Sequence, residues 1–302
     1  MTYYLLIFLL VLVGYFTYQF IKVKDYKGLG IAFGVLAIAG IFAIGANATN
    51  LLATTEYTKF STRGKSELTI NSNGSKVTEN SALSRDYITE YSYGIAESFN
   101  LIAPRLFGGS NNETLGTDSS MYQFMISQGV PEVQAADYVK GMPTYWGDQP
   151  IVAAPAYIGA VVFFLAFLAL FIDNRKIKYV FFGGAMIALV LSWGKNLPTV
   201  TDFFIDYIPL YDKFRAVSSI QVLLELCFPV LAVMGLQSFF QLEQAQQKKA
   251  LLQSTLFGVG VMLILFLFKG TFNFSAASDD YFIKNYGPAF VDALKSDRKT
   301  MY

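Results

Sequence analysis

The chain has 302 residues, of which 54% are hydrophobic and 15% charged, and this indicates a membrane protein because soluble domains carry about 25% charged residues. The formal net charge of +1 indicates no particular partner, and because no basic stripe suggests nucleic acid, we expect no nucleic-acid partner. Because histidine is absent and Cys227 is the single cysteine, the sequence excludes a Ser-His-Asp triad, an intrachain disulfide and a zinc site built from those residues.

Six apolar stretches are long enough, or nearly so, to cross a bilayer, which takes about 20 residues. In chain order they are Tyr3–Ile21, Leu29–Ala46, Ile151–Ile172, Tyr179–Trp193, Ser219–Phe240 and Leu251–Phe268. They predict an all-α polytopic membrane protein with about six transmembrane helices. The regions expected from them are two membrane helices (1–46), a long segment outside the membrane (47–150), four more membrane helices (151–268) and an amphipathic tail (269–302).

Basic residues in the short loops predict the orientation of the helices, because such loops stay in the cytoplasm. Lysine and arginine gather in the alternate loops 21–27, 173–178 and 241–250, which therefore lie on one side. The long segment 47–150 and both ends of the chain are then expected outside. Because an external N-terminus that starts directly on a membrane helix is unusual, we expect the chain to be a piece of a longer protein.

The long external segment has a mixed α+β pattern. Two short strand-like runs, 66–70 and 76–78, flank an Asn/Gly-rich turn and predict a hairpin. Residues 131–140 start with proline and are followed by Gly141, which predicts a helix.

The loop 194–218 is the most informative stretch, because it is rich in aromatic residues although it leaves the membrane. Asp202 and Asp206 are spaced to share one helical face. Three cations surround them, namely Lys195, Lys213 and Arg215. One interpretation is a site for an anionic, lipid-linked substrate whose phosphate the cations hold. The other is an interfacial helix anchored by aromatic residues, with lysine and arginine extending to water.

Two further polar features lie near this loop. Glu225 lies about 10 Å inside the fifth span, with Gln221 one turn before it. An intramembrane carboxylate is either a functional residue or part of a structural hydrogen bond or ion pair with a neighbouring helix. Trp146 and Asp148 end the external segment just before the third span, where they predict either a vestibule shared with Lys195 or a plain interface belt. No spacing of ligands predicts a metal, and we expect no cofactor.

Six short segments then stand out in chain order. They are FSTRGKSEL (60–68), YSYGIAES (91–98), LFGG (106–109), YWGDQP (145–150), WGKN (193–196) and PLYDKFRA (209–216). Together they resemble segments of the YfhO family of bacterial membrane proteins, in the style of its Bacteroidetes branch, over roughly residues 55–240.

The resemblance implies a membrane enzyme of the C-type glycosyltransferase superfamily in the bacterial cytoplasmic (inner) membrane. Such enzymes pass a sugar from a polyprenyl-phosphate donor to an envelope polymer or lipid acceptor on the outer side of the bilayer. Their catalytic carboxylate usually lies in the first external loop, which we expect to precede Met1. The catalytic residue of this chain is therefore unknown, and we expect the fragment alone to be inactive.

Binding is the role that remains for this part of such an enzyme. Lys195 and Arg215 are expected to hold the donor phosphate, with Lys213, Asp202 and Asp206 as further candidate substrate-binding residues. The residues expected to line the acceptor side are Arg63, Glu97, Trp146 and Asp148. Two alternatives stay open: a transporter or channel that uses Glu225 in its pathway, and a non-catalytic protein of envelope assembly.

Overall fold

The computed structural model describes residues 1–58, 60–61 and 83–302. These residues form two compact units: the first is Met1–Thr89 with Asp202–Ala216, and the second is Glu90–Thr201 with Val217–Tyr302. The described chain is mostly helical and contains no strand, only an isolated bridge between Glu113 and Met142. The predicted hairpin at 66–78 and Arg63 lie outside the described residues.

Among the described residues, four helical segments are long and apolar enough to cross a membrane. They are Thr2–Lys22 (α1), Tyr26–Ala46 (α2), Val217–Phe239 (η5 and α10) and Gln244–Thr271 (α11 and η6). This confirms the predicted all-helical character of the described chain and gives four candidate membrane spans, whereas six were predicted. Two more apolar helices, Ala160–Ile172 (α7) and Ile177–Ser192 (α8), have 13 and 16 residues. At ~1.5 Å per residue they are shorter than the ~30 Å hydrocarbon core of a bilayer.

The predicted third span began too early, at Ile151. Helix α7 starts only at Ala160, and residues 151–159 are irregular. Pro155 has no backbone N–H and disfavours a helical residue before it. Gly159 then adopts a φ of +110°, which is outside the helical region.

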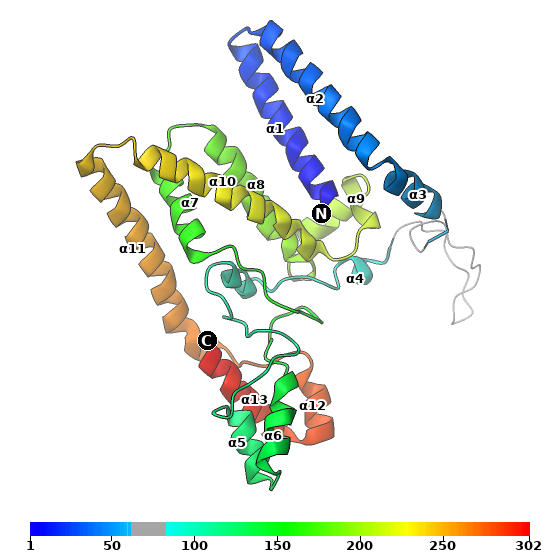
Figure 1. Ribbon diagram of the computed structural model, residues 1–302, viewed down its shortest axis with the longest axis vertical. Coiled ribbons are helices and arrows are strands. Elements are labelled where there is room, and N and C mark those ends of the chain that lie inside the picture. Colours follow the sequence, from blue (N-terminus) through cyan, green and yellow to red (C-terminus); the bar gives the residue numbers. More distant parts are fainter. Residues whose placement is uncertain (59, 62–82) are drawn as a thin grey trace. The chain divides into compact units, whose positions relative to one another are not determined.

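In the first unit, α1 and α2 run side by side in opposite directions (Figure 1). Helix α2 starts where the Asp25 carboxylate accepts a hydrogen bond from the Gly28 N–H, a normal N-terminal cap. The unit also contains α3 (Ala48–Thr58) and the single turn α4 (Arg85–Ile88).

The aromatic residues of the loop 202–216 pack against the start of α1. Tyr3 stacks on Phe214 with ring centroids 4.8 Å apart, and its hydroxyl donates to the Pro209 carbonyl at 2.6 Å. Tyr211, in the short helix η4 (Tyr211–Lys213), is buried beside Tyr4. This packing removes apolar surface of the loop from water.

In the second unit, α7, α8 and α10 (Val222–Phe239) pack together, and α11 (Gln244–Phe268) lies along α7 (Figure 1). Phe163 of α7 stacks on Phe228 of α10 at 4.7 Å. A Cβ at Gly235 of α10 would collide with the backbone of α7, so this glycine permits close helix contact.

A buried carboxylate joins the α7–α8 loop to the end of α10. Asp173 accepts hydrogen bonds from Arg175, at 2.5 Å, and from Ser238, at 2.8 Å. Burial alone would raise the pKa of Asp173, but these hydrogen bonds outweigh it and the pKa lies below its ordinary value. Lys178 donates to the Asp173 and Leu170 carbonyls and thereby caps α7.

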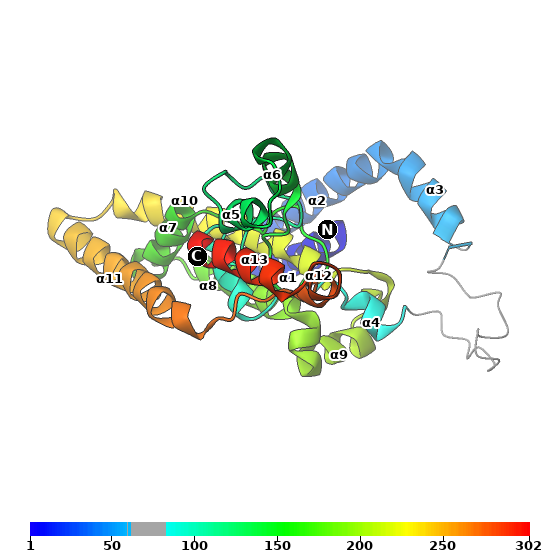
Figure 2. The same cartoon turned by 90° about the horizontal axis from the view of Figure 1, so that it is seen from below.

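The other helices of the second unit form a separate small core. They are α5 (Ser120–Ser127), α6 (Glu132–Tyr138), α12 (Asp279–Tyr286) and α13 (Pro288–Met301), seen from below in Figure 2. The apolar face of α13, with Phe290, Val291 and Leu294, packs against Met121 and Val139.

Two charged residues of α13 tie this core together. Asp297 accepts from the Ser120 and Met121 N–H groups and so caps α5. The fully buried Arg298 binds both carboxylate oxygens of Asp279, at 2.8 and 3.0 Å, and donates to the Pro143 carbonyl at 3.0 Å.

Candidate functional site

Lys195 lies in a short helix, η3 (Gly194–Asn196), immediately after α8. Trp193 anchors this turn, because its indole N–H donates to Ser98 Oγ at 2.7 Å. The Lys195 backbone N–H donates to Ser92 Oγ at 3.0 Å, which fixes the position of the residue. Its side chain is exposed, and within the described residues its ammonium meets only the backbone carbonyl of Asp148, at 3.3 Å.

Asp148 lies next to Lys195 and is held by Asn196. The Asn196 side-chain N–H₂ donates to Asp148 Oδ2 at 2.9 Å and to the Tyr93 carbonyl at 2.8 Å. Asp148 is exposed, so its carboxylate keeps room to accept hydrogen bonds from a ligand. The predicted neighbourhood of Lys195 and Asp148 is therefore present within the second unit.

Glu97 lies beneath Asp148 and is only 1% exposed. Its Oε1 accepts from the Tyr145 hydroxyl at 2.5 Å, and its Oε2 from the backbone N–H groups of Gly94 and Asp148 at 3.0 and 3.3 Å. Burial raises the pKa of Glu97 although these hydrogen bonds oppose it, and burial together with the Glu97 charge raises the pKa of Tyr145. Glu97 thus holds two turns together and orients Asp148.

Trp146 lies in the interior and not at a ligand surface. Its ring stacks on Phe107 with centroids 4.1 Å apart and also contacts Phe272 and Phe274. The expectation that Trp146 and Glu97 line an acceptor surface needs correction, because both side chains are buried. They support the backbone around Asp148 from within.

The remaining candidates of the loop 202–216 belong to the first unit. Asp202 and Asp206 lie on α9 (Pro198–Tyr207) and share a helical face, as the spacing predicts. Both bind Arg85, which forms an ion pair with each carboxylate, at 2.8 Å for Asp206. Sequence reasoning missed Arg85, since it lies more than 100 residues away in the chain.

Lys213 and Arg215 also have protein partners in the first unit. Lys213 forms an ion pair with Asp212 at 3.2 Å. Arg215 lies over the Tyr87 ring, 4.6 Å from its centroid, and donates to the Tyr87 hydroxyl at 3.3 Å. The two cations that the sequence suggested for binding a phosphate therefore already interact with Asp212 and Tyr87.

The two polar residues near the start of α10 have different surroundings. Glu225 is exposed on the helix, whereas Gln221 is buried and donates to Ser192 Oγ at 3.4 Å. They do not form one polar stripe.

Across the described ranges, no cluster of three or more histidine, cysteine, aspartate or glutamate side chains has the geometry of a metal site.

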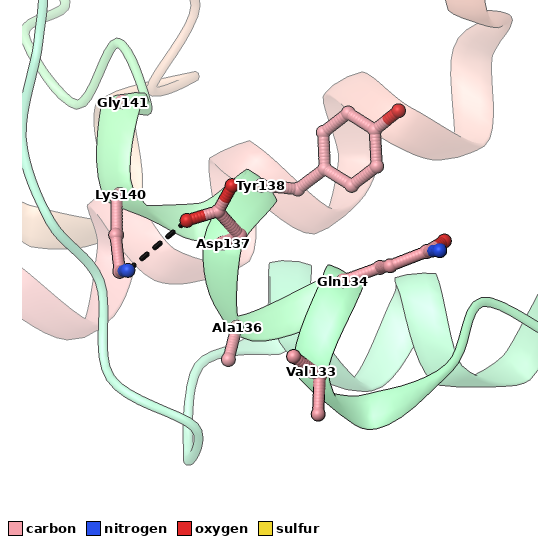
Figure 3. Close-up of a pocket in the computed structure, with 7 residues that line it drawn as sticks. All are labelled: Val133, Gln134, Ala136, Asp137, Tyr138, Lys140 and Gly141. Carbon is pink, nitrogen blue, oxygen red and sulfur yellow. Dashed lines mark hydrogen bonds and ion pairs between the residues drawn. The ribbon is translucent and has the colours of Figure 1, made fainter.

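A hollow of about 1050 Å³ lies on α6 and η2 (Val139–Gly141). Figure 3 shows that its side chains point in different directions, with Tyr138 and Gln134 away from the ion pair between Asp137 and Lys140. It therefore lacks the converging polar groups of a binding site.

A second cavity of about 260 Å³ is lined by polar residues that sequence analysis did not select, among them Asn100, Arg105 and Glu113. The neighbouring LFGG segment (106–109) was its only signal in the sequence.

Comparisons of the chain with protein-family models, with curated proteins and with solved structures each find no match.

Proposed function

We propose that the chain is part of a membrane glycosyltransferase-like protein and binds the phosphate of a polyprenyl-phosphate-linked sugar through Lys195. The acceptor would be an envelope polymer or lipid at the outer face of the bacterial inner membrane. The resemblance to the YfhO family supports this assignment of class, and because histidine is absent, the cationic side chains that could bind a phosphate are lysine and arginine.

The exposed ammonium of Lys195 is the observation that carries the proposal. Lys195 lies just after the apolar helix α8. Within the part of the chain that the structure describes, no carboxylate forms an ion pair with its ammonium. Lys213 and Arg175, by contrast, are paired with Asp212 and Asp173. An ammonium without a counter-ion attracts a phosphate, and a fixed cation stabilises the charge that develops on a phosphate leaving group.

Asp148, held by Asn196, would bind the sugar that is joined to the phosphate. A carboxylate accepts hydrogen bonds from hydroxyl groups, and Asn196 already fixes the direction of the Asp148 carboxylate. A sugar joined to the phosphate at Lys195 would present hydroxyls within reach of Asp148. Glu97 and Tyr145 would hold this arrangement in place without contact with the ligand.

Equilibrium binding of a polyprenyl-phosphate hexose to the protein in nanodiscs tests the proposal. Replacing Lys195 by glutamine is expected to weaken binding about 10- to 100-fold, because a hydrogen bond to a charged group is worth about 1.5–3 kcal/mol. Lys140→Gln, which removes an exposed lysine from η2, is the matched control and should bind like the wild type.

A second ligand isolates the contribution of the phosphate. With a polyprenol-linked hexose that lacks phosphate, wild type and Lys195→Gln should bind equally weakly. Equal affinity of the two proteins for the phosphate-bearing donor would refute the assignment of Lys195.

A further inference from the structure

Asn100, one of the residues that line the cavity beside the LFGG segment, has an incompletely bonded side-chain amide. Asn100 is 1% exposed, and its Oδ1 accepts the Phe107 N–H at 3.0 Å, which identifies the other atom as the N–H₂ group. Within the described ranges this Nδ2 has no hydrogen-bond partner. A buried donor without an acceptor costs about 1–3 kcal/mol, so the site favours a molecule that brings an acceptor.

The polar wall of the cavity carries charges that cancel. Arg105 and Glu113 both line it and form an ion pair with each other, and Glu113 also accepts a hydrogen bond from Thr144. Ser110 adds a hydroxyl whose oxygen accepts the Asn112 N–H at 3.1 Å. A charged ligand would compete with the Arg105–Glu113 pair, whereas a neutral ligand can bind beside it.

The cavity also has apolar lining residues, and the neighbouring backbone is closely packed. Pro104, Pro155 and two alanines line the cavity without polar side chains. Gly108 has a φ of +82°, and a Cβ there would collide with the Thr144 carbonyl. The glycine therefore allows the backbone to bring Arg105 and Glu113 to the same cavity.

From these features we infer a binding site for one uncharged, hexose-sized sugar unit. A sugar offers hydroxyls that both donate and accept, which suits a cavity lined by an amide donor and a carboxylate, and its C–H face suits proline and alanine. Pockets for drug-sized ligands have about 300–1,000 Å³, so a cavity of about 260 Å³ fits a single ring. The site does not include Lys195, so it does not depend on the role proposed for that residue.

Saturation-transfer NMR on the full chain in nanodiscs tests this inference. The probes are glucose, galactose, mannose and N-acetylglucosamine, with glucuronate as the charged counterpart. We expect at least one neutral sugar to receive saturation in the wild type and in Lys195→Gln. Asn100→Ala should weaken its binding about tenfold, as expected for one or two lost hydrogen bonds.

A blocking variant keeps the test valid if Asn100→Ala does not fold. Ala154→Trp fills the cavity from its exposed rim and should abolish the signal, whereas Ala136→Trp, on the hollow of α6 in Figure 3, should leave it unchanged. The inference is overturned if no neutral sugar binds the wild type, if only glucuronate binds, or if Ala154→Trp binds as well as the wild type.

Discussion

Replacement of Arg298 by methionine is expected to lower the opening free energy of α13 by about 3–5 kcal/mol, because it leaves the buried Asp279 without its partner. Arg298 is fully buried, binds both oxygens of Asp279 and also donates to two carbonyls, those of Phe274 and Pro143. Hydrogen exchange of the α5 and α13 amides measures this opening directly.

Lys299→Met is the matched control for this prediction. It removes a cation of similar length from the next position of the same helix, but Lys299 is exposed. Its exchange rates should stay within the range of ordinary surface substitutions, about ±0.5 kcal/mol. Equal protection of α13 in both variants would show that the Arg298–Asp279 pair does not hold this core together.

Replacement of Gly194 by alanine is expected to destabilise the turn by about 2–4 kcal/mol and to weaken donor binding although Lys195 remains. Gly194 has a φ of +42°, and an added Cβ would collide with Ser92 Oγ and lie 2.6 Å from Val217 Cγ2. Ser92 is the group that accepts the Lys195 N–H. Thermal unfolding and donor affinity in nanodiscs measure the two effects.

Gly183→Ala provides the comparison within α8. An added Cβ at Gly183 meets no heavy atom within 4 Å, and alanine favours a helix more than glycine does. It should bind the donor normally and unfold no earlier than the wild type. If Gly194→Ala behaves in the same way, the geometry of the turn does not determine the position of Lys195.

Hydrophobic runs were sufficient to predict the four helices of the described chain that are long and apolar enough to cross a membrane. The bounds predicted for the first two differ from α1 and α2 by at most three residues, because uninterrupted apolar runs leave few alternatives. The start of α7 was missed because the run continues through Pro155 and Gly159, whose backbone preferences end the helix there. Hydropathy alone does not report such preferences.

The partners of charged residues could not be predicted from the sequence. Arg85 binds Asp202 and Asp206 from more than 100 residues away, and Arg105 binds Glu113 across the Gly/Asn-rich loop between them. Such pairs depend on how the chain folds back, which local patterns do not encode. The neighbourhood of Lys195 and Asp148 was one of two interpretations of the sequence, because Asp148 directly precedes one apolar run and Lys195 directly follows the next.

The most direct measurement is the dipolar coupling between the Lys195 ammonium nitrogen and the donor phosphorus. The protein carries ¹⁵N in its lysine side chains and is held in a maltoside detergent, so that the polyprenyl-phosphate hexose is the only source of ³¹P. We predict that phosphorus dephases a lysine signal that is absent from Lys195→Gln. Two results would contradict the binding of the donor phosphate by Lys195. One is dephasing of the same lysine signal in Lys195→Gln, and the other is the absence of any lysine dephasing in the wild type with the donor bound.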